Sequence, residues 1–339
     1  MSLLNVKNLS VRFAPPGRPV VEAVQGVSFT VKPKETLALV GESGSGKSVT
    51  ASAIMGLINK KSADMSGSIL LGGLDVLTAQ EREIRALRGR EAAMVFQDPM
   101  SALNPYYTVG KQIAEAYEVH HPKSSKKERQ LIALDMLAKV GLPKPSECID
   151  EYPHQFSGGM RQRIVIAIAL VNNPRLLIAD EPTTALDVTV QAQILELMMN
   201  LQQEFGSAII LITHDLGVVA EVSDEVMVMY AGQTLESSKV QTLFDTPSHP
   251  YTRGLLGSVR SLDNSERGAL HTIAGNPPSM ISLPGGCPFH PRCEFSASMN
   301  GLCTTVQPTL RLLPATGSES ACHLNDDQLL SLGRGVNHD

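Results

Sequence analysis

Short apolar runs separated by turn residues occupy the first part of the chain and predict strands. Residues 3–33 alternate in this way, with Pro15-Pro16-Gly17 as one turn, and we expect antiparallel strands there. The continuous apolar run at residues 37–40 is typical of a buried strand. A helix is expected at residues 48–58, where apolar residues recur at helical spacing.

The pattern turns from strand-like to helical beyond residue 104. Strand-like runs precede the change at residues 69–71 and 93–96. Helices are then expected at residues 109–120, 126–140 and 158–172. Ser125 and Glu128 are spaced as a capping box for the second of these helices.

Strands and helices alternate again beyond residue 175, which predicts an α/β core with a mostly parallel sheet. Strands are expected at residues 176–179, 209–212 and 226–229, and helices at 189–204 and 216–222. From about residue 236 the pattern becomes helical. Beyond residue 275 the chain is rich in Pro, Gly and Cys, which predicts a separate C-terminal module.

Composition narrows the classes of protein only slightly. The 339 residues are 42% hydrophobic, enough for a globular core, and the net charge of −5 argues against a general nucleic-acid binder. The N-terminal residues lack the pattern of a signal peptide, and no apolar run approaches the roughly 20 residues of a membrane helix. We therefore expect a chain without its own membrane span, in a compartment where its five cysteines stay reduced.

A complete G-x-x-x-x-G-K-S phosphate loop follows the apolar run at residues 37–40. Its residues are Gly41, Glu42, Ser43, Gly44, Ser45, Gly46, Lys47 and Ser48. The strand, glycine-rich loop and helix form the context that the motif requires, because loop N–H groups and the helix N-terminus attract phosphate. We expect Lys47 to reach the β and γ phosphates and Ser48 to ligate Mg²⁺. The alternative is a glycine-rich turn with a surface lysine.

Acidic and polar residues at other strand ends fit phosphoryl transfer. Asp180 and Glu181 follow the run at residues 176–179, where one acid can reach Mg²⁺ and the next can face an attacking water. Gln97 can contact both the metal and the water, and His214 can donate to the γ phosphate. The alternatives are acids that cap the next helix and a structural histidine.

Ser157-Gly158-Gly159 opens the helix expected at residues 158–172, which makes a second potential anion site or an ordinary helix cap. The order of these motifs resembles that of the ATP-binding-cassette (ABC) ATPases. That resemblance implies an α/β P-loop NTPase core with an antiparallel β subdomain and a helical subdomain, over residues 3 to about 260. It implies ATP and Mg²⁺ as cofactors, with Ser48, Gln97 and Asp180 at the metal and Glu181, His214 and Gln97 in catalysis.

The resemblance further implies a head-to-tail dimer with ATP sandwiched between two cassettes. Ser157, Gly158, Gly159 and Met160 would then face the partner's nucleotide, and Asp187 belongs to the loop after the acids. Phe13 matches the aromatic position that stacks on adenine, or it is simply core. Phe156 and Met160 stand where the family's common signature has Leu and Gln, which puts the composite site in the partner in doubt.

Four cysteines gather near the C-terminal end: Cys287, Cys293, Cys303 and Cys322. Thiolates in a loop-rich segment can bind a soft metal, although the intervals are longer than those of most zinc sites, and chance clustering is the alternative. Cys148 is isolated. Together with His249-Pro250-Tyr251-Thr252, this tail resembles the extension of the oligopeptide and dipeptide importer ATPases, which implies a [4Fe-4S] cluster on the four cysteines.

The expectation for the whole chain follows from that resemblance. We expect an ATP-binding domain at residues 1–260, with a helical insert at about 99–172, and a C-terminal extension at 261–339. The chain would hydrolyse ATP to drive peptide import, with a second, similar ATPase, two permeases and an external binding protein, at the cytoplasmic face of the inner membrane. The alternatives are an ATPase for import of nickel or another small solute and a soluble non-transport ABC protein.

Overall fold

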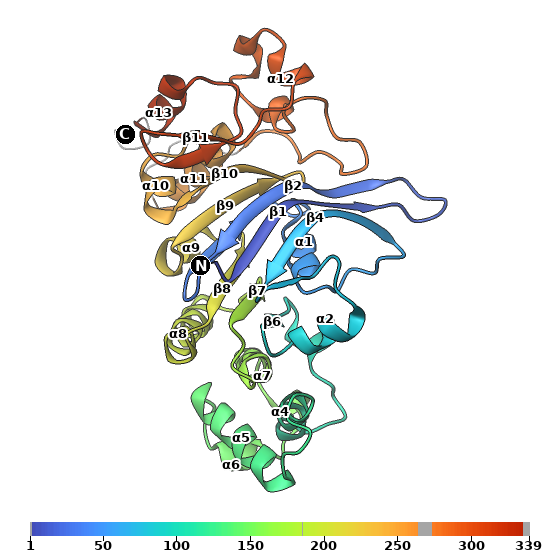
Figure 1. Cartoon of the computed structure of the whole chain (residues 1–339). Helices are drawn as coiled ribbons and strands as arrows, with labels where there is room; N and C mark the ends of the chain where they lie inside the picture. The colour runs from blue at the N-terminus through green and yellow to red at the C-terminus, as the bar shows by residue number, and fades with distance from the viewer. Residues whose placement is uncertain (1, 185, 264–272, 335–339) are drawn as a thin grey trace.

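Two β-sheets, one antiparallel and one mainly parallel, form the centre of the molecule (Figure 1). The computed structural model describes residues 2–184, 186–263 and 273–334. The antiparallel sheet has the order β2-β1-β4-β5, and its strands are β1 (Leu4–Phe13), β2 (Val21–Val31), β4 (Ala63–Leu71) and β5 (Leu74–Asp75). The antiparallel strands expected in residues 3–33 are thereby confirmed.

The second sheet carries the catalytic motifs and has the order β11-β12-β10-β9-β3-β8-β7-β6. Its strands are β3 (Thr36–Val40), β6 (Ala92–Val95), β7 (Leu176–Asp180), β8 (Ala208–Thr213), β9 (Glu225–Tyr230), β10 (Gln233–Lys239), β11 (Arg311–Leu313) and β12 (Ser318–Ser320). The five strands from β9 to β6 are parallel, as the alternation of strands and helices predicts.

Helices cover both faces of this sheet, so its central strands are continuous apolar runs. The longer helices are α1 (Lys47–Ile54), α4 (Val109–Glu118), α5 (Lys126–Lys139), α7 (Gly158–Leu170), α8 (Val188–Phe205), α11 (Pro250–Asp263) and α13 (Asp326–Arg334). The shorter ones are α2 (Glu81–Leu87), α3 (Pro99–Ala102), α6 (Pro145–Cys148), α9 (Leu216–Val222), α10 (Val240–Asp245), α12 (Leu302–Thr305), η1 (Pro153–Gln155), η2 (His290–Arg292) and η3 (Ser296–Met299).

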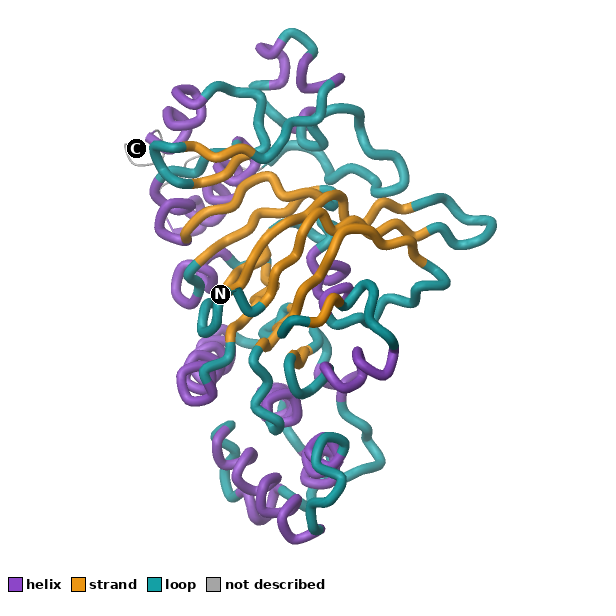
Figure 2. Tube along the Cα trace, in the orientation of Figure 1, coloured by secondary structure: helices purple, strands orange, loops and turns teal. Residues whose placement is uncertain are grey.

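Alternate residues of β7 separate two layers of the core. Leu176 and Ile178 pack with α1 and the antiparallel sheet, whereas Leu177 and Ala179 pack with α7 and α8. Because side chains of a strand point alternately to opposite faces, α1 and α7 lie on opposite sides of the sheet. Figure 2 shows the helices α4 to α7 at one end of the molecule and the C-terminal segments at the other.

Local signals set several helix ends. Ser125 and Glu128 form the expected capping box of α5, with the Glu128 N–H donating to Ser125 Oγ over 3.2 Å. Asp187 caps α8, where its carboxylate accepts from the Val190 N–H over 3.0 Å, and Gly206 ends that helix in the left-handed region. In the described ranges, no helix combines the length and apolarity needed to cross a bilayer.

The sequence pattern predicts helix from about residue 236, and the structure differs for the segment that starts at residue 233. It begins with β10, which carries polar residues, and the C-terminal strand β12 pairs with it at Glu236 and Ser320. The Ser320 hydroxyl donates to the Ser248 carbonyl oxygen over 2.7 Å. The C-terminal segments therefore extend the main sheet and contribute Cys287, Phe289 and Ala321 to a core that includes β9.

A buried carboxyl lies at this junction. Glu236 on β10 is fully buried, and the N–H and hydroxyl of Ser248 both donate to its Oε1, each over 2.8 Å. Burial raises the pKa of Glu236 to about 7. Nearby, burial lowers the pKa of His249 to about 3. Both groups are therefore most stable here in their neutral forms.

We predict that Glu236→Gln gains stability relative to the wild type as pH rises from 4.5 to 7.5. The unfolded carboxyl ionises near pH 4.5 but the folded one only near 7. The contribution of the neutral Glu236 carboxyl to the stability of the wild type is therefore complete below pH 4.5 and is lost as pH rises through 7. The change in relative free energy of unfolding should be on the order of 1–3 kcal/mol. Urea unfolding of both proteins across this range measures it.

His249 has the opposite pH dependence, but both proteins contain it, so the comparison at each pH removes its contribution. A difference between the two proteins that does not vary with pH would contradict a buried, neutral Glu236.

Candidate functional site

The phosphate loop joins β3 to α1 and is shaped by its glycines. Gly41 has φ 147°, and a Cβ placed on it would lie 2.1 Å from the Met229 carbonyl oxygen at the end of β9. Gly46 has φ 102°, and its Cβ would lie 2.6 Å from the Ala23 carbonyl oxygen. Any side chain at either position would push the loop off the sheet end, so these glycines fix the loop's place at the N-terminus of α1.

Lys47 lies inside this loop and is only 5% exposed. Its ammonium donates to the carbonyl oxygens of Gly41 over 2.7 Å and Glu42 over 3.0 Å, and to Ser45 Oγ over 3.3 Å. Burial lowers the pKa of Lys47, while the charges of Glu181, Asp180 and Glu42 oppose that shift. A buried cation held by neutral acceptors is a strong attractor for an incoming anion.

Ser48 and Asp180 meet across the end of the sheet. The Ser48 hydroxyl donates to Asp180 Oδ1 over 3.0 Å. Burial raises the pKa of Asp180, and the hydrogen bond from Ser48 opposes the shift. Hydroxyl and carboxylate oxygens are the donor set that Mg²⁺ prefers, so this pair fits that metal.

Glu181 follows directly and is held by three side chains. Its Oε2 accepts from Gln97 Nε2 over 2.8 Å and from the Thr184 hydroxyl over 3.0 Å, and its Oε1 lies 3.6 Å from His214 Nδ1. The sequence-predicted residues Gln97, Glu181 and His214 therefore meet at one place. Thr184 was missed, although its position three residues after Glu181 is a local signal.

The backbone of Glu181 has φ 47°, in the left-handed region that a residue with a Cβ occupies at a cost of about 1 kcal/mol or more. Its N–H is held by the Ile212 carbonyl oxygen of β8 over 2.9 Å. This strained turn sends the carboxylate toward Gln97 and Thr184 instead of along the line of β7.

Ser157 caps α7, and its hydroxyl accepts from the Met160 N–H over 3.4 Å. Ser157 and Gly158 are exposed, and α7 lies on the face of the sheet opposite to α1. The two departures from the family signature have local explanations. Phe156 is buried in the core beneath the helices, and Met160 packs against the same core.

Asp187 and Phe13 lie outside the cluster around Glu181. Asp187 uses its carboxylate to cap α8, as described above. Phe13 ends β1, pairs with Val21 and Ala63 on the neighbouring strands, and packs partly buried against the core beneath the antiparallel sheet. The contact of Phe13 with adenine stays a prediction.

Glu42 is the loop residue whose contacts the sequence did not indicate. Both of its carboxylate oxygens accept from Arg292 in η2, and its N–H donates to the Tyr251 hydroxyl over 3.1 Å. These partners lie 250 and 209 residues along the chain, so no local pattern could reveal them.

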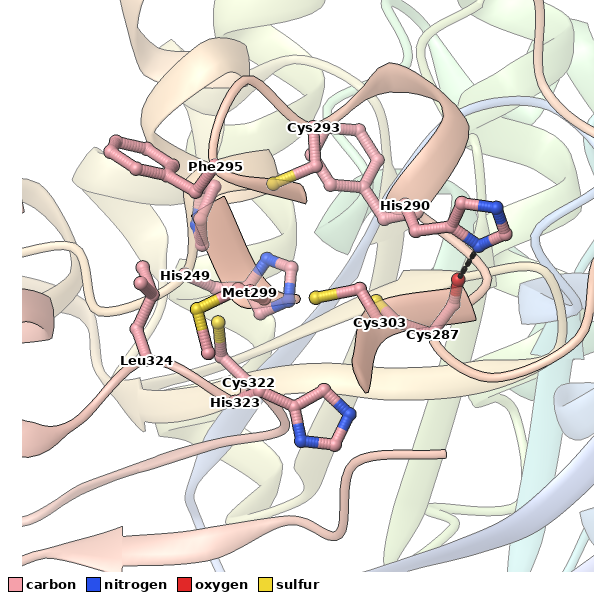
Figure 3. Close-up of a pocket in the computed structure, with 12 residues that line it drawn as sticks. His249, Cys287, His290, Cys293, Phe295, Met299, Cys303, Cys322, His323 and Leu324 are labelled. Atoms are coloured by element: carbon pink, nitrogen blue, oxygen red, sulfur yellow. Dashed lines mark hydrogen bonds between the residues drawn. The ribbon is translucent and has the colours of Figure 1, made fainter. Parts of the chain in front are cut away.

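The four C-terminal cysteines line one small pocket together with His290, Met299 and other side chains (Figure 3). Figure 3 shows the sulfur atoms of Cys293, Cys303 and Cys322 turned toward its middle. The pocket has a volume of about 10 Å³, which is barely enough for one water molecule. Burial raises the pKa of Cys287 to about 12 and that of Cys293 to about 11, which favours thiols over thiolates.

The prediction of a [4Fe-4S] cluster on Cys287, Cys293, Cys303 and Cys322 is wrong. Within residues 2–184, 186–263 and 273–334, no group of three or more His, Cys, Asp or Glu side chains is arranged to hold a metal ion. The cluster was expected from the resemblance of the tail to the importer ATPases, and it would also have ordered this loop-rich segment. Pairing of β12 with β10 and burial of Phe289 in the core supply that order instead.

Comparison with known proteins agrees with the order of the motifs. A model of the family described as ABC transporter matches residues 24–184, and one described as oligopeptide/dipeptide transporter, C-terminal region, matches residues 235–299. A dimeric ATP-binding cassette solved in a post-hydrolysis state with ADP and phosphate is 26% identical, with a TM-score of 0.62. The match covers 70% of this chain and 98% of that one.

Two relatives match this chain in sequence over most of their own length. The dipeptide transport ATP-binding protein DppD of Bacillus subtilis is 54% identical over 86% of each chain. The oligopeptide transport ATP-binding protein OppD of Salmonella typhimurium is 48% identical over 97% of this chain and 95% of its own. The names of these relatives describe ATP-binding transport proteins and mention no iron–sulfur cluster. The chain therefore belongs to the ATP-binding proteins of the ABC transporter family and is an ABC-type ATPase.

Proposed function

We propose that this chain hydrolyses ATP to power the import of dipeptides and oligopeptides through a membrane ABC transporter. The observation that carries the ATPase part is the convergence of Gln97, Thr184 and His214 on Glu181, next to the Ser48–Asp180 pair. The peptide part is supported by relatives of 48–54% identity that are dipeptide and oligopeptide transport proteins, and by the match of residues 235–299.

The phosphate loop supplies nucleotide binding in this proposal. Loop N–H groups and the N-terminus of α1 attract the phosphates, and Lys47 exchanges its carbonyl partners for β and γ phosphate oxygens. Phe13 stacks on the adenine. Ser48, Asp180 and Gln97 would hold Mg²⁺, which would neutralise negative charge on the phosphates.

Glu181 acts on the attacking water. Its carboxylate is oriented by Gln97 and Thr184, and it accepts a proton from the water or fixes its position. His214 lies on the other side of the same carboxylate, is exposed, and is free to turn and donate to the γ phosphate. Strain in the backbone of Glu181 helps to aim this group.

A second cassette completes the site. Ser157, Gly158, Gly159 and Met160 begin a helix on the opposite face of the sheet from α1, and the exposed Ser-Gly-Gly turn suits the nucleotide of a partner chain. Asp187 lies in the loop that would face that partner. Because Met160 replaces a glutamine amide, we propose a heterodimer with two unequal sites.

We propose that the ATPase pair works as part of a larger membrane assembly. The ATPase pair docks on two permease subunits at the cytoplasmic face of the inner membrane, and an extracytoplasmic binding protein delivers the peptide. Residues 1–260 form the ATP-binding domain, with the helical insert at about 99–172, and residues 261–339 form the C-terminal extension. Residues 264–272 and 335–339 of that extension lie outside the described residues.

We predict that Glu181→Gln keeps ATP binding but lowers turnover by about 10²–10⁴-fold, the usual contribution of a positioned acid–base group. The amide preserves size and can still accept from Gln97, so binding should not change. Lys47→Ala should instead weaken binding itself. The measurements are the ATPase rate of the assembled transporter and the nucleotide dissociation constant. Near-normal turnover of Glu181→Gln would remove Glu181 from this role.

We predict that ATPase activity depends on a second chain. The rate per molecule should rise with protein concentration and rise further when the partner ATPase is added, because an isolated chain lacks a finished site. Ser157→Arg should lower activity in the mixture without changing nucleotide binding to the isolated chain. Full activity that is independent of concentration in a monomer would contradict the sandwich arrangement.

Uptake assays test the transported substrate. Cells that lack this chain should lose uptake of labelled di- and oligopeptides and regain it with the wild-type chain but not with Glu181→Gln. Nickel uptake, measured in the same cells, should not change. Loss of nickel uptake with intact peptide uptake would contradict the peptide assignment.

A further inference from the structure

The second residue of the phosphate loop is held by the C-terminal part of the chain. Arg292 Nη1 donates to Glu42 Oε2 over 2.6 Å, and Arg292 Nη2 donates to Glu42 Oε1 over 3.0 Å. The arginine side chain is 6% exposed and that of Glu42 is 25% exposed. A two-pronged pair of this kind fixes the orientation of the carboxylate as well as its distance.

Arg292 is itself firmly anchored. Its Nε donates to the Ala274 carbonyl oxygen over 3.0 Å, Nη2 also donates to the Ile273 carbonyl oxygen over 3.4 Å, and Nη1 also donates to the Tyr230 hydroxyl over 3.3 Å. With the two bonds to Glu42, these contacts match the five N–H donors of a guanidinium. Burial lowers the pKa of Arg292, but its hydrogen bonds to Glu42 and Tyr230 outweigh this, so the net shift is upward.

The backbone of Glu42 is held from the same side. Its N–H donates to the hydroxyl of Tyr251, a fully buried residue whose ring lies 4.7 Å from that of Tyr230 and 5.2 Å from that of Phe289. The Glu42 N–H is therefore already paired with Tyr251. The Glu42 carbonyl oxygen remains in the loop, where it accepts from Lys47.

The charge of Glu42 makes this arrangement matter for an anion. A carboxylate at the edge of a phosphate loop repels the phosphates that the loop attracts, and the repulsion is strong in a partly buried site. Arg292 neutralises that charge and holds the carboxylate against η2. Arg253 of α11, by comparison, forms a longer and more exposed ion pair with Glu294, at 3.8 Å.

We propose that Arg292 is a positioning residue for the nucleotide: it neutralises and orients Glu42, so that the C-terminal region sets the affinity of the phosphate loop for ATP. The inference rests on the nucleotide site proposed above. It makes the oligopeptide-type C-terminal region a working part of that site, connected to it through η2 and the rings of Tyr230, Tyr251 and Phe289.

The test compares four full-length variants with the wild type: Arg292→Gln, Glu42→Gln, the double variant, and Arg253→Gln as the matched control. The measurements are dissociation constants for ATP and ADP with Mg²⁺ and the midpoint of thermal unfolding. Arg292→Gln should weaken ATP binding about tenfold or more and ADP binding less, because ADP carries less charge. Arg253→Gln should bind ATP within about threefold of the wild type, and Glu42→Gln should weaken ATP binding less than Arg292→Gln does, because no carboxylate is left to repel the phosphates.

The double variant separates positioning from folding. If Arg292 acts through Glu42, removing the carboxylate in Arg292→Gln should restore ATP affinity to within about threefold of Glu42→Gln. Should Arg292→Gln fail to fold, the double variant decides, because a folded double variant that binds ATP supports the proposal and one that also fails to fold overturns it.

Unchanged ATP affinity in a folded Arg292→Gln overturns the inference, and so does a loss that the double variant does not restore. Equal losses for ATP and ADP overturn the charge argument. Absence of ATP binding by the wild type would instead overturn the proposed function, so the two failures are distinguishable.

Discussion

Burial of charge at the carboxyl end of the main sheet is the constraint around which this chain is organised. The ammonium of Lys47 and the carboxylate of Asp180 are less than one-tenth exposed. Burying such groups is costly unless each has partners, so the loop carbonyls hold the lysine and Ser48 holds the aspartate. Those partners are groups that a triphosphate and its metal can replace, which makes the nucleotide the natural way to satisfy the site.

The alternation of side chains along the parallel strands determines which face of the main sheet each helix covers. Because β7 sends successive residues to opposite faces, the helix that starts in the phosphate loop and the helix that starts at Ser157 lie on different sides of one sheet. A cassette with this geometry has the phosphate loop on one side of the sheet and the exposed turn at Ser157 on the other. In the proposed dimer, two chains facing head to tail would bring the phosphate loop of one chain to the Ser157 turn of the other.

Much of the fold and of the nucleotide site could be predicted from the sequence, because the signals for the strands, loops and helices are local. The runs around β3, β7 and β8 and the capping box of α5 are examples. Gln97, Glu181 and His214 meet because residues that follow parallel strands share one sheet edge. The polar strand β10 and the short β12 gave no apolar pattern, so they were missed. The contact of Arg292 with Glu42 depends on tertiary packing alone. The iron–sulfur prediction failed because the resemblance rested on the positions of the cysteines in the sequence, which do not specify the arrangement of the sulfur atoms.

The pairing of β12 with β10 has a consequence for how the chain behaves in solution. Without the last segment, β10 would be an edge strand with unpaired N–H and C=O groups, directly beside the buried strand β9. Exposed edges of this kind recruit strands of other molecules and promote aggregation. The hairpin of β11 and β12 moves the edge outward to a strand of three residues, Arg311–Leu313, which is too short to template much pairing. A chain cut before this hairpin would thus be prone to self-association even with every nucleotide-binding residue intact.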